Sequence, residues 1–473
     1  MKPQNDGLKS YVASKAQQIG KRHLEDCDLA GLFMGCGLGK TALCLDRIAD
    51  LNFNLETKGV LVFAPVRVTN MTWPIEPGEF KEFTWLRVAN LRTKEGWEAL
   101  EAGSAHIYVI NYEGIPKLIK NYLKGRRVTK WAFDTVIYDE LTAFKNPDSK
   151  RARAIRHYMF KLKRRWGLTG TPNPNSLLEV FGQVLMLDGG QRLGKSYAQF
   201  RDRYFEKEGW VGRNYVLKGQ WAEDAIYGKI KDICISLKTS DYSESPDIEE
   251  VDYEIPIPKV ILKDYLELQM ELFAEIQGAP VLAPTAAALA GKLLQMTGGG
   301  VYSQDEDGSE RQELELHTEK NKAIRAIQKS EGGGPVVIFC QFQHEQARIL
   351  KGVPGAVAIS SFKTAESQQQ LLRDWNAGKI KALVSHPKSA AHGLNLQHGS
   401  HVIIWATPTY SGEYYEQGNR RVARRGQKRT PRVWRILCKD SIDWAPISAL
   451  KRKDKGSQSL LKALKAYAKA LRS

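Results

Sequence analysis

Short apolar runs alternate with amphipathic stretches along most of the chain, and the runs fall into two groups. The first group is VLVFA from Val60, IYVI from Ile107, TVIY from Thr135 and WGLT from Trp166. The second group is PVVIF from Pro335, VAIS from Val357, ALVS from Ala382, HVIIW from His401 and VWRIL from Val433. Short runs rich in β-branched side chains, separated by helical stretches, are typical of parallel strands with helices on both faces of the sheet. The pattern therefore predicts an α/β fold with two similar lobes.

The segment between the two groups has a different pattern. Residues 187–318 are helical and irregular, and glycine triplets at 298–300 and 332–334 favour flexible joints. The ending SLLKALKAYAKAL places leucines on one side of a helix and lysines elsewhere, which favours packing onto the second lobe over contact with nucleic acid or a membrane. The predicted organisation is a first lobe at 1–186, a helical insertion and linker at 187–318, a second lobe at 319–456 and a C-terminal amphipathic helix at 457–473.

Composition and charge narrow the class of protein. The 473 residues include 70 Lys and Arg against 53 Asp and Glu. The net charge of +17 attracts polyanions such as nucleic acid, although a basic surface that only serves solubility fits this number equally well. The six cysteines form no C-x-x-C pair, so a zinc site is not expected. The N-terminus lacks an apolar secretory segment and no apolar stretch reaches spanning length, so we expect a reducing cytosolic compartment and no membrane partner.

The glycine-rich segment GLFMGCGLGKTALCL contains GxGKT, the core of a phosphate-binding loop that leads into a helix. Gly37 and Gly39 let backbone N–H groups point inward. Lys40 can reach the terminal phosphates, and Thr41 can supply a hydroxyl ligand to Mg²⁺. The full pattern G-x-x-x-x-G-K-[ST] expects glycine where this chain has Met34. The competing interpretation is a glycine-rich turn with an incidental lysine.

A pair of carboxylates, Asp139 and Glu140, follows the apolar strand in VIYDELTAFKN. The carboxyl end of a strand is where an open α/β sheet exposes its ligand crevice. Asp139 would hold magnesium through water, and Glu140 would orient and deprotonate an attacking water. Most Asp-Glu pairs are solvated surface charges. The position after a buried strand, downstream of a phosphate loop, favours the catalytic interpretation.

Further segments of the first lobe follow in a fixed order. VLVFAPVRVTNMTW carries Pro65 and Trp73, IYVINYEGI carries Tyr112 and Glu113, FKN follows DELT, and LTGTP begins at Leu168. In this order they resemble the Swi/Snf-like branch of helicase superfamily two, and GQRLGKSYAQFRDRYF resembles its small phage and bacterial members. The resemblance implies two RecA-like lobes, each a mainly parallel sheet flanked by helices, joined by a helical insertion.

Two segments of the second lobe extend this resemblance. HGLNLQ carries Gly393, Asn395 and Gln397, and in YEQGNRRVARRGQ the residues Gln417, Arg421, Arg424, Gly426 and Gln427 fall on the Q-x-x-x-R-x-x-R-x-G-Q spacing of the family's last motif. Two arginines three positions apart on a helix share one face. From there they can enter the cleft between the lobes and neutralise charge on the transferring phosphoryl group. A solvated basic helix or a nucleic-acid patch is the alternative interpretation of RRVARR.

The resemblance also implies roles, cofactors and partners. ATP and Mg²⁺ are the implied cofactors. Duplex or forked DNA is the implied partner, and a nuclease or a replication or recombination protein can be a second one, in the cytoplasm of a bacterium or a phage-infected host. The implied residues are Lys40, Glu140, Arg421 and Arg424 for catalysis, Thr41 and Asp139 for the metal, Gly37, Gly39, Lys40, Thr41, Gln17, Gly393 and Gln417 for the nucleotide, and Thr169, Thr171, Asn395 and Gln397 for DNA and its coupling to hydrolysis. Gln18 is an equal candidate to Gln17 for the adenine contact.

Contacts of such a motor with DNA are expected at the sugar-phosphate backbone. A basic stretch, read as the helix after the carboxylate pair, holds Lys150, Arg151, Arg153, Arg156, Lys161, Lys163, Arg164 and Arg165. The hypothesis is a DNA-dependent ATPase that translocates on duplex. One alternative is strand separation or annealing on forked DNA. Another is a non-hydrolysing DNA-binding remnant, which Met34 favours and the intact Lys40, Asp139 and Glu140 oppose.

Overall fold

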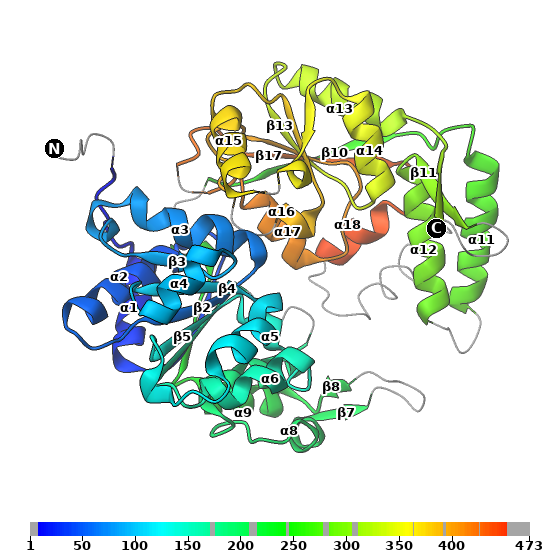
Figure 1. The fold of residues 1–473 in the computed structure, drawn as a ribbon. Helices are drawn as coiled ribbons and strands as arrows, with labels where there is room; N and C mark the ends of the chain where they lie inside the picture. The colour runs from blue at the N-terminus through cyan, green and yellow to red at the C-terminus, as the bar shows by residue number, and fades with distance from the viewer. Residues whose placement is uncertain are drawn as a thin grey trace. The chain divides into compact units, whose positions relative to one another are not determined.

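The computed structural model describes residues 8–170, 176–207, 215–242, 246–277, 283–304, 311–362, 364–390, 394–424 and 426–451. The chain forms two compact units, Met1–Ser243 and Glu244–Ser473. Each unit is built around one parallel sheet, as the two groups of apolar runs predict (Figure 1).

The first unit contains a seven-stranded sheet in the order β3-β4-β2-β5-β6-β1-β9, with every pair parallel. Its strands are β1 (Leu29–Met34), β2 (Val60–Ala64), β3 (Val88–Asn90), β4 (Ile107–Asn111), β5 (Thr135–Asp139), β6 (Arg164–Thr169) and β9 (Cys234–Leu237). Successive residues of a strand point to opposite faces, so on β2 Leu61 and Phe63 join one apolar cluster while Val60 and Val62 join the other. Burial on both faces explains why the central strands are continuous apolar runs.

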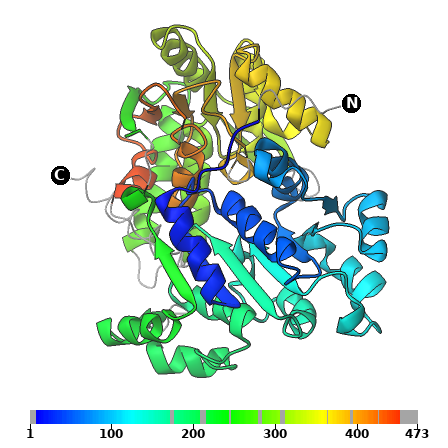
Figure 2. The same cartoon turned by 90° about the vertical axis from the view of Figure 1, so that its left-hand side faces the viewer.

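Helices cover both faces of this sheet. One face carries α1 (Lys15–Asp26), α2 (Lys40–Phe53) and α3 (Trp73–Ile75), and Figure 2 shows the blue α1 and α2 in front of the strands. The other face carries α4 (Lys94–Ala102), α5 (Ile115–Leu118), α6 (Lys150–Met159), α7 (Leu178–Asp188), α8 (Tyr197–Tyr204) and α9 (Gln220–Ile230). A short helix, α10 (Thr239–Tyr242), follows β9, and β7 (Phe205–Lys207) pairs antiparallel with β8 (Tyr215–Leu217).

The second unit contains a six-stranded parallel sheet in the order β10-β17-β16-β13-β15-β14. Its strands are β10 (Glu249–Ile255), β13 (Val336–Phe339), β14 (Ala356–Ala358), β15 (Ala382–Ser385), β16 (Val402–Trp405) and β17 (Arg432–Cys438). One face is covered by α13 (Glu319–Ser330) and α14 (Gln343–Gly352), and the other by α15 (Ala365–Asn376) and α17 (Gly412–Asn419). The short α16 is Pro387–Ala390.

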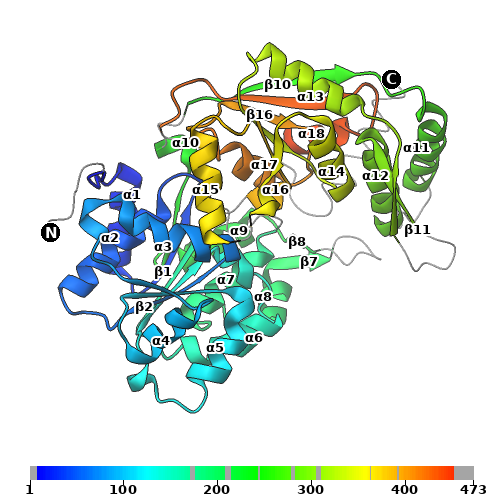
Figure 3. The ribbon, with the colours of Figure 1, turned by 45° about the horizontal axis from the view of Figure 1, so that its top comes forward.

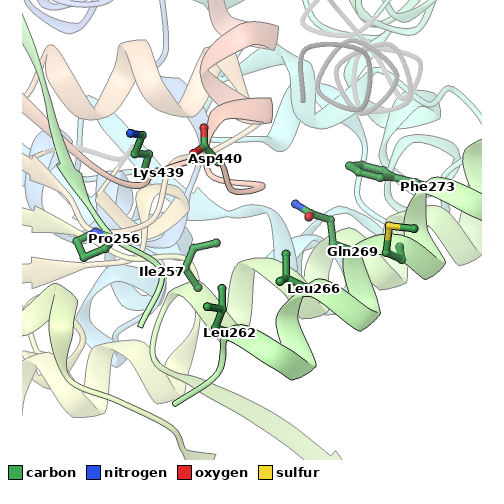
Figure 4. A pocket seen from close by; sticks show the side chains of 9 residues that line it. Pro256, Ile257, Leu262, Leu266, Gln269, Phe273, Lys439 and Asp440 are labelled. Carbon is green, nitrogen blue, oxygen red and sulfur yellow. The ribbon is translucent and has the colours of Figure 1, made fainter. Parts of the chain in front are cut away.

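A helical hairpin with its own core belongs to this unit. It consists of α11 (Leu262–Gln277) and α12 (Ala283–Thr297), and α18 (Trp444–Lys451) packs against it (Figure 3). The antiparallel pair β11 (Gly300–Gln304) and β12 (Arg311–Glu315) follows α12. A groove of about 700 Å³ runs along α11 and is lined by Leu262, Leu266, Met270 and Phe273 of this helix and by Lys439 and Asp440 (Figure 4).

The structure differs from the sequence prediction in the segment 187–318. Besides the helical hairpin, this segment supplies β9 to the first sheet and β10 to the second, and the division between the units falls at Ser243. Both strands lie at the edge of their sheet, and they mix polar with apolar residues, so neither shows the continuous apolar run of a central strand.

The predicted C-terminal helix at 457–473 lies outside the described residues. Within the described part of the chain, no helix is both long enough and apolar enough to cross a membrane.

A buried ion pair connects three elements of the second unit. The Lys320 ammonium on α13 lies 3.0 Å from a carboxylate oxygen of Asp443, and both side chains are almost fully buried. Asp443 also accepts hydrogen bonds from the Thr297 hydroxyl at 2.7 Å and from the Cys438 amide at 3.0 Å. Burial alone would lower the pKa of Lys320, but nearby groups, Asp443 foremost, raise it, so the lysine stays protonated.

Replacement of Lys320 by methionine is expected to destabilise the protein, because it leaves Asp443 buried without a countercharge. The expected loss in free energy of unfolding is about 3–5 kcal/mol. Lys322→Met, on the exposed side of the same helix, is the matched control and should cost less than about 0.5 kcal/mol. Urea denaturation of both variants measures the difference, and equal losses would contradict the assigned role of the ion pair.

Candidate active site

The glycine-rich loop joins β1 to α2 at the carboxyl end of the first sheet. Gly37 and Gly39 have φ values of 84° and 72°, a left-handed conformation that favours glycine, and Gly39 is the N-cap of α2. The backbone N–H groups at the start of a helix are free to bind an anion, and the helix dipole favours negative charge there. The geometry is that of a phosphate-binding loop.

Met34, which stands where the phosphate-loop pattern expects glycine, is the last residue of β1. Its side chain is fully buried, and its carbonyl oxygen accepts a hydrogen bond from the Lys40 ammonium at 2.8 Å. Because the chain is still extended at this position, the backbone needs no glycine. The lysine is oriented across the loop by a carbonyl that any residue could supply.

Asp139 ends β5, beside the loop. The Trp73 indole N–H donates a hydrogen bond to its carboxylate at 2.9 Å. Burial raises the pKa of Asp139 to about 6; the Trp73 hydrogen bond opposes this rise, the charge of Glu140 adds to it, and the charge of Lys40 opposes it. The loop that carries Lys40 follows β1 and Asp139 ends β5, so both lie at the carboxyl end of the same parallel sheet.

Glu140 has an unusual backbone. Its φ and ψ of 73° and 68° lie in the left-handed region, which costs a non-glycine residue on the order of 1–3 kcal/mol. Its carboxylate accepts hydrogen bonds from the hydroxyls of Thr142 at 2.7 Å and Thr169 at 3.0 Å. The Tyr112 hydroxyl lies 2.5 Å from the Asp139 carbonyl oxygen and 3.0 Å from that of Glu140, and its single proton serves both acceptors. The surroundings therefore hold both ends of Glu140.

The two glutamines left open by the sequence occupy different places. The Gln17 side chain donates to the Gly39 carbonyl at 3.1 Å, and Ser14 and Gln17 cap α1 reciprocally. The Gln18 side chain donates instead to the Ala13 carbonyl at an exposed position. Gln17 is thus the one that touches the phosphate loop, and its contact with adenine stays a prediction.

The predicted residues of the second unit lie close to one another. The Arg424 guanidinium donates to the Asn395 side chain, and the Leu396 amide donates to the Arg421 carbonyl at 3.0 Å. The Gln427 side chain donates to the Gln397 carbonyl at 2.9 Å. These hydrogen bonds connect residues 395–397 with residues 421–427, so the two motifs of the second unit lie side by side. Gln417, buried on α17, donates to Glu413 at 3.0 Å.

The expectation that Arg421 and Arg424 share a helix face is wrong. The helix α17 ends at Asn419, and both arginines lie in the turns that follow. Gly418 and Asn419 are weak helix formers, and the Asn419 side chain accepts a hydrogen bond from the Trp405 indole at 3.0 Å. The helix therefore ends at Asn419, directly before the pair Arg420 and Arg421.

The basic residues that follow Asp139 and Glu140 in the sequence fall into two groups in the structure, one exposed and one buried. The cations Lys150, Arg151 and Arg153 on α6, and Lys161 and Lys163 after it, are exposed. Arg164 and Arg165 instead begin β6 and are buried. Arg164 lies 3.2 Å from an Asp28 carboxylate oxygen, and Arg165 donates to the carbonyls of Leu187 and Leu162. These two arginines brace the sheet and do not belong to an exposed basic helix.

Two predicted residues, Thr171 and Gly393, lie outside the described residues. The sequence does not predict the role of three side chains that position the carboxylates: Thr142 belongs to no recognised motif, and Trp73 and Tyr112 mark the resemblance without indicating a contact. The signals that could have indicated this role are a hydroxyl two residues after Glu140 and aromatic donors in the segments that follow β2 and β4 of the same parallel sheet.

Comparisons with known proteins identify the family. Residues 22–207 match the family described as SNF2-related domain, and residues 319–426 match the helicase conserved C-terminal domain. "Putative protein p41" of Acyrthosiphon pisum secondary endosymbiont phage 1 is 30% identical over 97% of this chain and all of its own length. The chain belongs to the SNF2-related helicases. It is of the Swi/Snf-like, DNA-dependent ATPase motor type, as the sequence predicts.

More distant similarities extend over the same length of this SNF2-related chain. Two Mycoplasma proteins, each called an uncharacterized ATP-dependent helicase, from M. pneumoniae and M. genitalium, are 24% identical over 92% and 93% of it, which is 40% and 41% of their own lengths. Two solved structures of the Sulfolobus solfataricus SWI2/SNF2 ATPase core are also similar. One, in complex with dsDNA, is 18% identical with a TM-score of 0.43 over 100% of this chain and 98% of that one. The other is 19% identical with a TM-score of 0.41 over 96% and 92%.

Replacement of Asp139 by asparagine is expected to stabilise the magnesium- and nucleotide-free protein above pH 6. The pKa of Asp139 is about 6 in the folded protein and about 3.9 in the unfolded chain. Wild type therefore loses stability as the pH rises through this window, and the full cost of about 1–3 kcal/mol is present above pH 6. Asparagine carries no charge and keeps an oxygen for Trp73. Denaturation midpoints between pH 4 and 8 test this, and a gain that is the same at both ends would contradict it.

Proposed function

We propose that this chain hydrolyses ATP with Mg²⁺ when it is bound to DNA, and that the energy moves it along duplex. The observation that carries the proposal is the arrangement in the first unit, where Lys40, Asp139 and Glu140 converge beside a glycine loop at a helix N-terminus. Membership of the SNF2-related family supports DNA as the activator, and the charge of +17 suits a polyanionic partner.

The residues present suit the nucleotide and its metal. The glycine loop and the first turn of α2 would bind the phosphates, and Gln17 the adenine. Thr41 and Asp139 would hold Mg²⁺, whose charge draws electrons from the terminal phosphate when it is bound. Within the described residues no cluster of three His, Cys, Asp or Glu could hold a metal by itself. A cation would therefore depend on phosphate oxygens, as Mg²⁺ usually does.

Each residue of the first unit has a distinct task in this proposal. Lys40 binds the terminal phosphate and compensates its charge. Glu140, held by Thr142 and Thr169, orients a water molecule and accepts its proton on a carboxylate oxygen. Trp73 fixes the rotamer of Asp139 through its indole N–H. The hydroxyl of Thr169 makes the strand end of β6 sensitive to the state of Glu140.

The arginines of the second unit complete the proposed site. Arg421 and Arg424 would reach the phosphates when the two lobes close, so that hydrolysis depends on closure. The Arg424 guanidinium donates a hydrogen bond to the Asn395 side chain, which ties this arginine to the neighbouring motif. Repeated closing and opening would shift the grip on the DNA backbone by small steps. A phage relative supports the cytoplasm of a bacterium or an infected host as the compartment.

Phosphate release with and without duplex DNA tests the catalytic roles. Lys40→Ala should abolish ATP binding, whereas Glu140→Gln should bind ATP and lose about 10²- to 10⁴-fold in kcat. Arg424→Ala should lose about 10³-fold or more, with ATP binding retained. Arg429→Ala, an exposed arginine beyond the motif, is the control and should match wild type. Full DNA-stimulated hydrolysis in the Lys40, Glu140 and Arg424 variants would contradict the assignment.

The output of the motor needs a separate measurement. We expect ATP-dependent displacement of a third strand from a triplex, which reports translocation on duplex, and no separation of a forked duplex. Lys40→Ala should be inactive in both assays. Strand separation or annealing of forked DNA without triplex displacement would favour the alternative output.

A further inference from the structure

The backbone of Glu140 depends on a side chain that lies between it and the basic helix α6. Tyr112 follows β4, its side chain is almost fully buried, and its hydroxyl lies against the carbonyls of both Asp139 and Glu140. The amide of Ala143 also donates to the Glu140 carbonyl, at 3.0 Å. Burial, together with the negative charges of Asp139 and Glu140, raises the pKa of Tyr112 well above its ordinary value. The hydroxyl therefore stays protonated and remains a donor.

The other side of the Tyr112 ring faces an exposed cation. The Arg151 guanidinium, in the first turn of α6, lies 5.7 Å from the ring centre. Phe144 packs edge-on against the same ring at 5.6 Å. A guanidinium near the face of an aromatic ring is attracted by the ring without using its N–H groups as donors to an oxygen. Arg151 can thus bind a DNA phosphate and contact Tyr112 at the same time.

We propose that Tyr112 is a positioning residue for Glu140, and that Arg151 transmits the binding of a DNA phosphate on α6 to it. When a phosphate fixes the guanidinium over the ring, the ring loses freedom to rock, and the hydroxyl holds the two carbonyls in the geometry that places the Glu140 carboxylate. Without the phosphate the same contacts exist but are weaker. The inference rests on the proposed function, because it explains how DNA would stimulate hydrolysis.

The chain offers a matched control for each residue. The hydroxyl of Tyr138, on β5, is buried and has no hydrogen-bond partner among the residues that the structure describes, so Tyr138→Phe removes the same group without the contact. Arg153 is exposed on the same helix, about 200° around its axis from Arg151, and so points away from Tyr112. Neither control residue belongs to the proposed catalytic machinery.

Amide hydrogen exchange of the peptide that spans 139–144, in nucleotide-free full-length protein, tests the proposal without hydrolysis. Tyr112→Phe should speed exchange in this peptide by about fivefold or more, and Tyr138→Phe should not. Duplex DNA should slow exchange there in wild type and in Arg153→Gln, but not in Arg151→Gln. Equal behaviour of each variant and its control would overturn the proposal, whether or not the protein is an ATPase.

Steady-state hydrolysis provides the second readout. Tyr112→Phe should lower kcat by about tenfold with KM for ATP within about twofold, because one hydrogen bond to the catalytic carboxylate's backbone is lost. Arg151→Gln should reduce the ratio of DNA-stimulated to basal kcat far more than Arg153→Gln, with similar affinity for DNA. In the Tyr112→Phe background, Arg151→Gln should cause no further reduction of this ratio. If Arg151→Gln lowers this ratio as much in the Tyr112→Phe background as in wild type, the proposed transmission from Arg151 to Tyr112 is wrong. If wild type hydrolyses no ATP, the proposed function fails, and the exchange experiment still decides the positioning role.

Discussion

Glu140 occupies a backbone conformation that a residue with a side chain adopts only when its surroundings compel it. Four groups do so in the first unit: the hydroxyls of Thr142 and Thr169 hold the carboxylate, the Tyr112 hydroxyl binds the carbonyl, and the Leu168 carbonyl binds the amide. These groups come from the ends of β4 and β6 and from the turn after β5. The parallel sheet is what brings them to one edge, because parallel strands all end on the same side.

The fold explains which parts of the sheet could be predicted from sequence. Central strands such as β2 and β5 are buried on both faces and therefore read as unbroken apolar runs. The edge strands β9 and β10 have a partner on one side only and tolerate polar residues, so the segment that contains them resembled an insertion. Arg164 and Arg165 end a run of basic residues in the sequence, which favours assigning them to the preceding helix, whereas in the structure they begin β6. Their charges are satisfied by Asp28 and by main-chain carbonyls.

Motif residues could be found from their spacing, but their tasks depend on contacts that are distant in sequence. Lys40, Asp139 and Glu140 follow from a loop and a strand end, which are local patterns. The hydrogen bond from Trp73 to Asp139 joins residues 66 positions apart, and no local pattern reports it. For Arg421 and Arg424 the local pattern itself is misleading. Their spacing suggested a helix, whereas Gly418, Asn419 and the hydrogen bond to Trp405 end that helix earlier.

Met34 has a consequence for how such loops are recognised. At this position the chain contributes a main-chain oxygen to the lysine and buries its side chain in the sheet, so the structure requires an extended backbone and apolar volume there. A search that demands glycine there would reject this chain while accepting glycine-rich turns that follow no strand. A criterion of a buried strand terminus five residues ahead of the Gly-Lys-Thr triplet would separate the two.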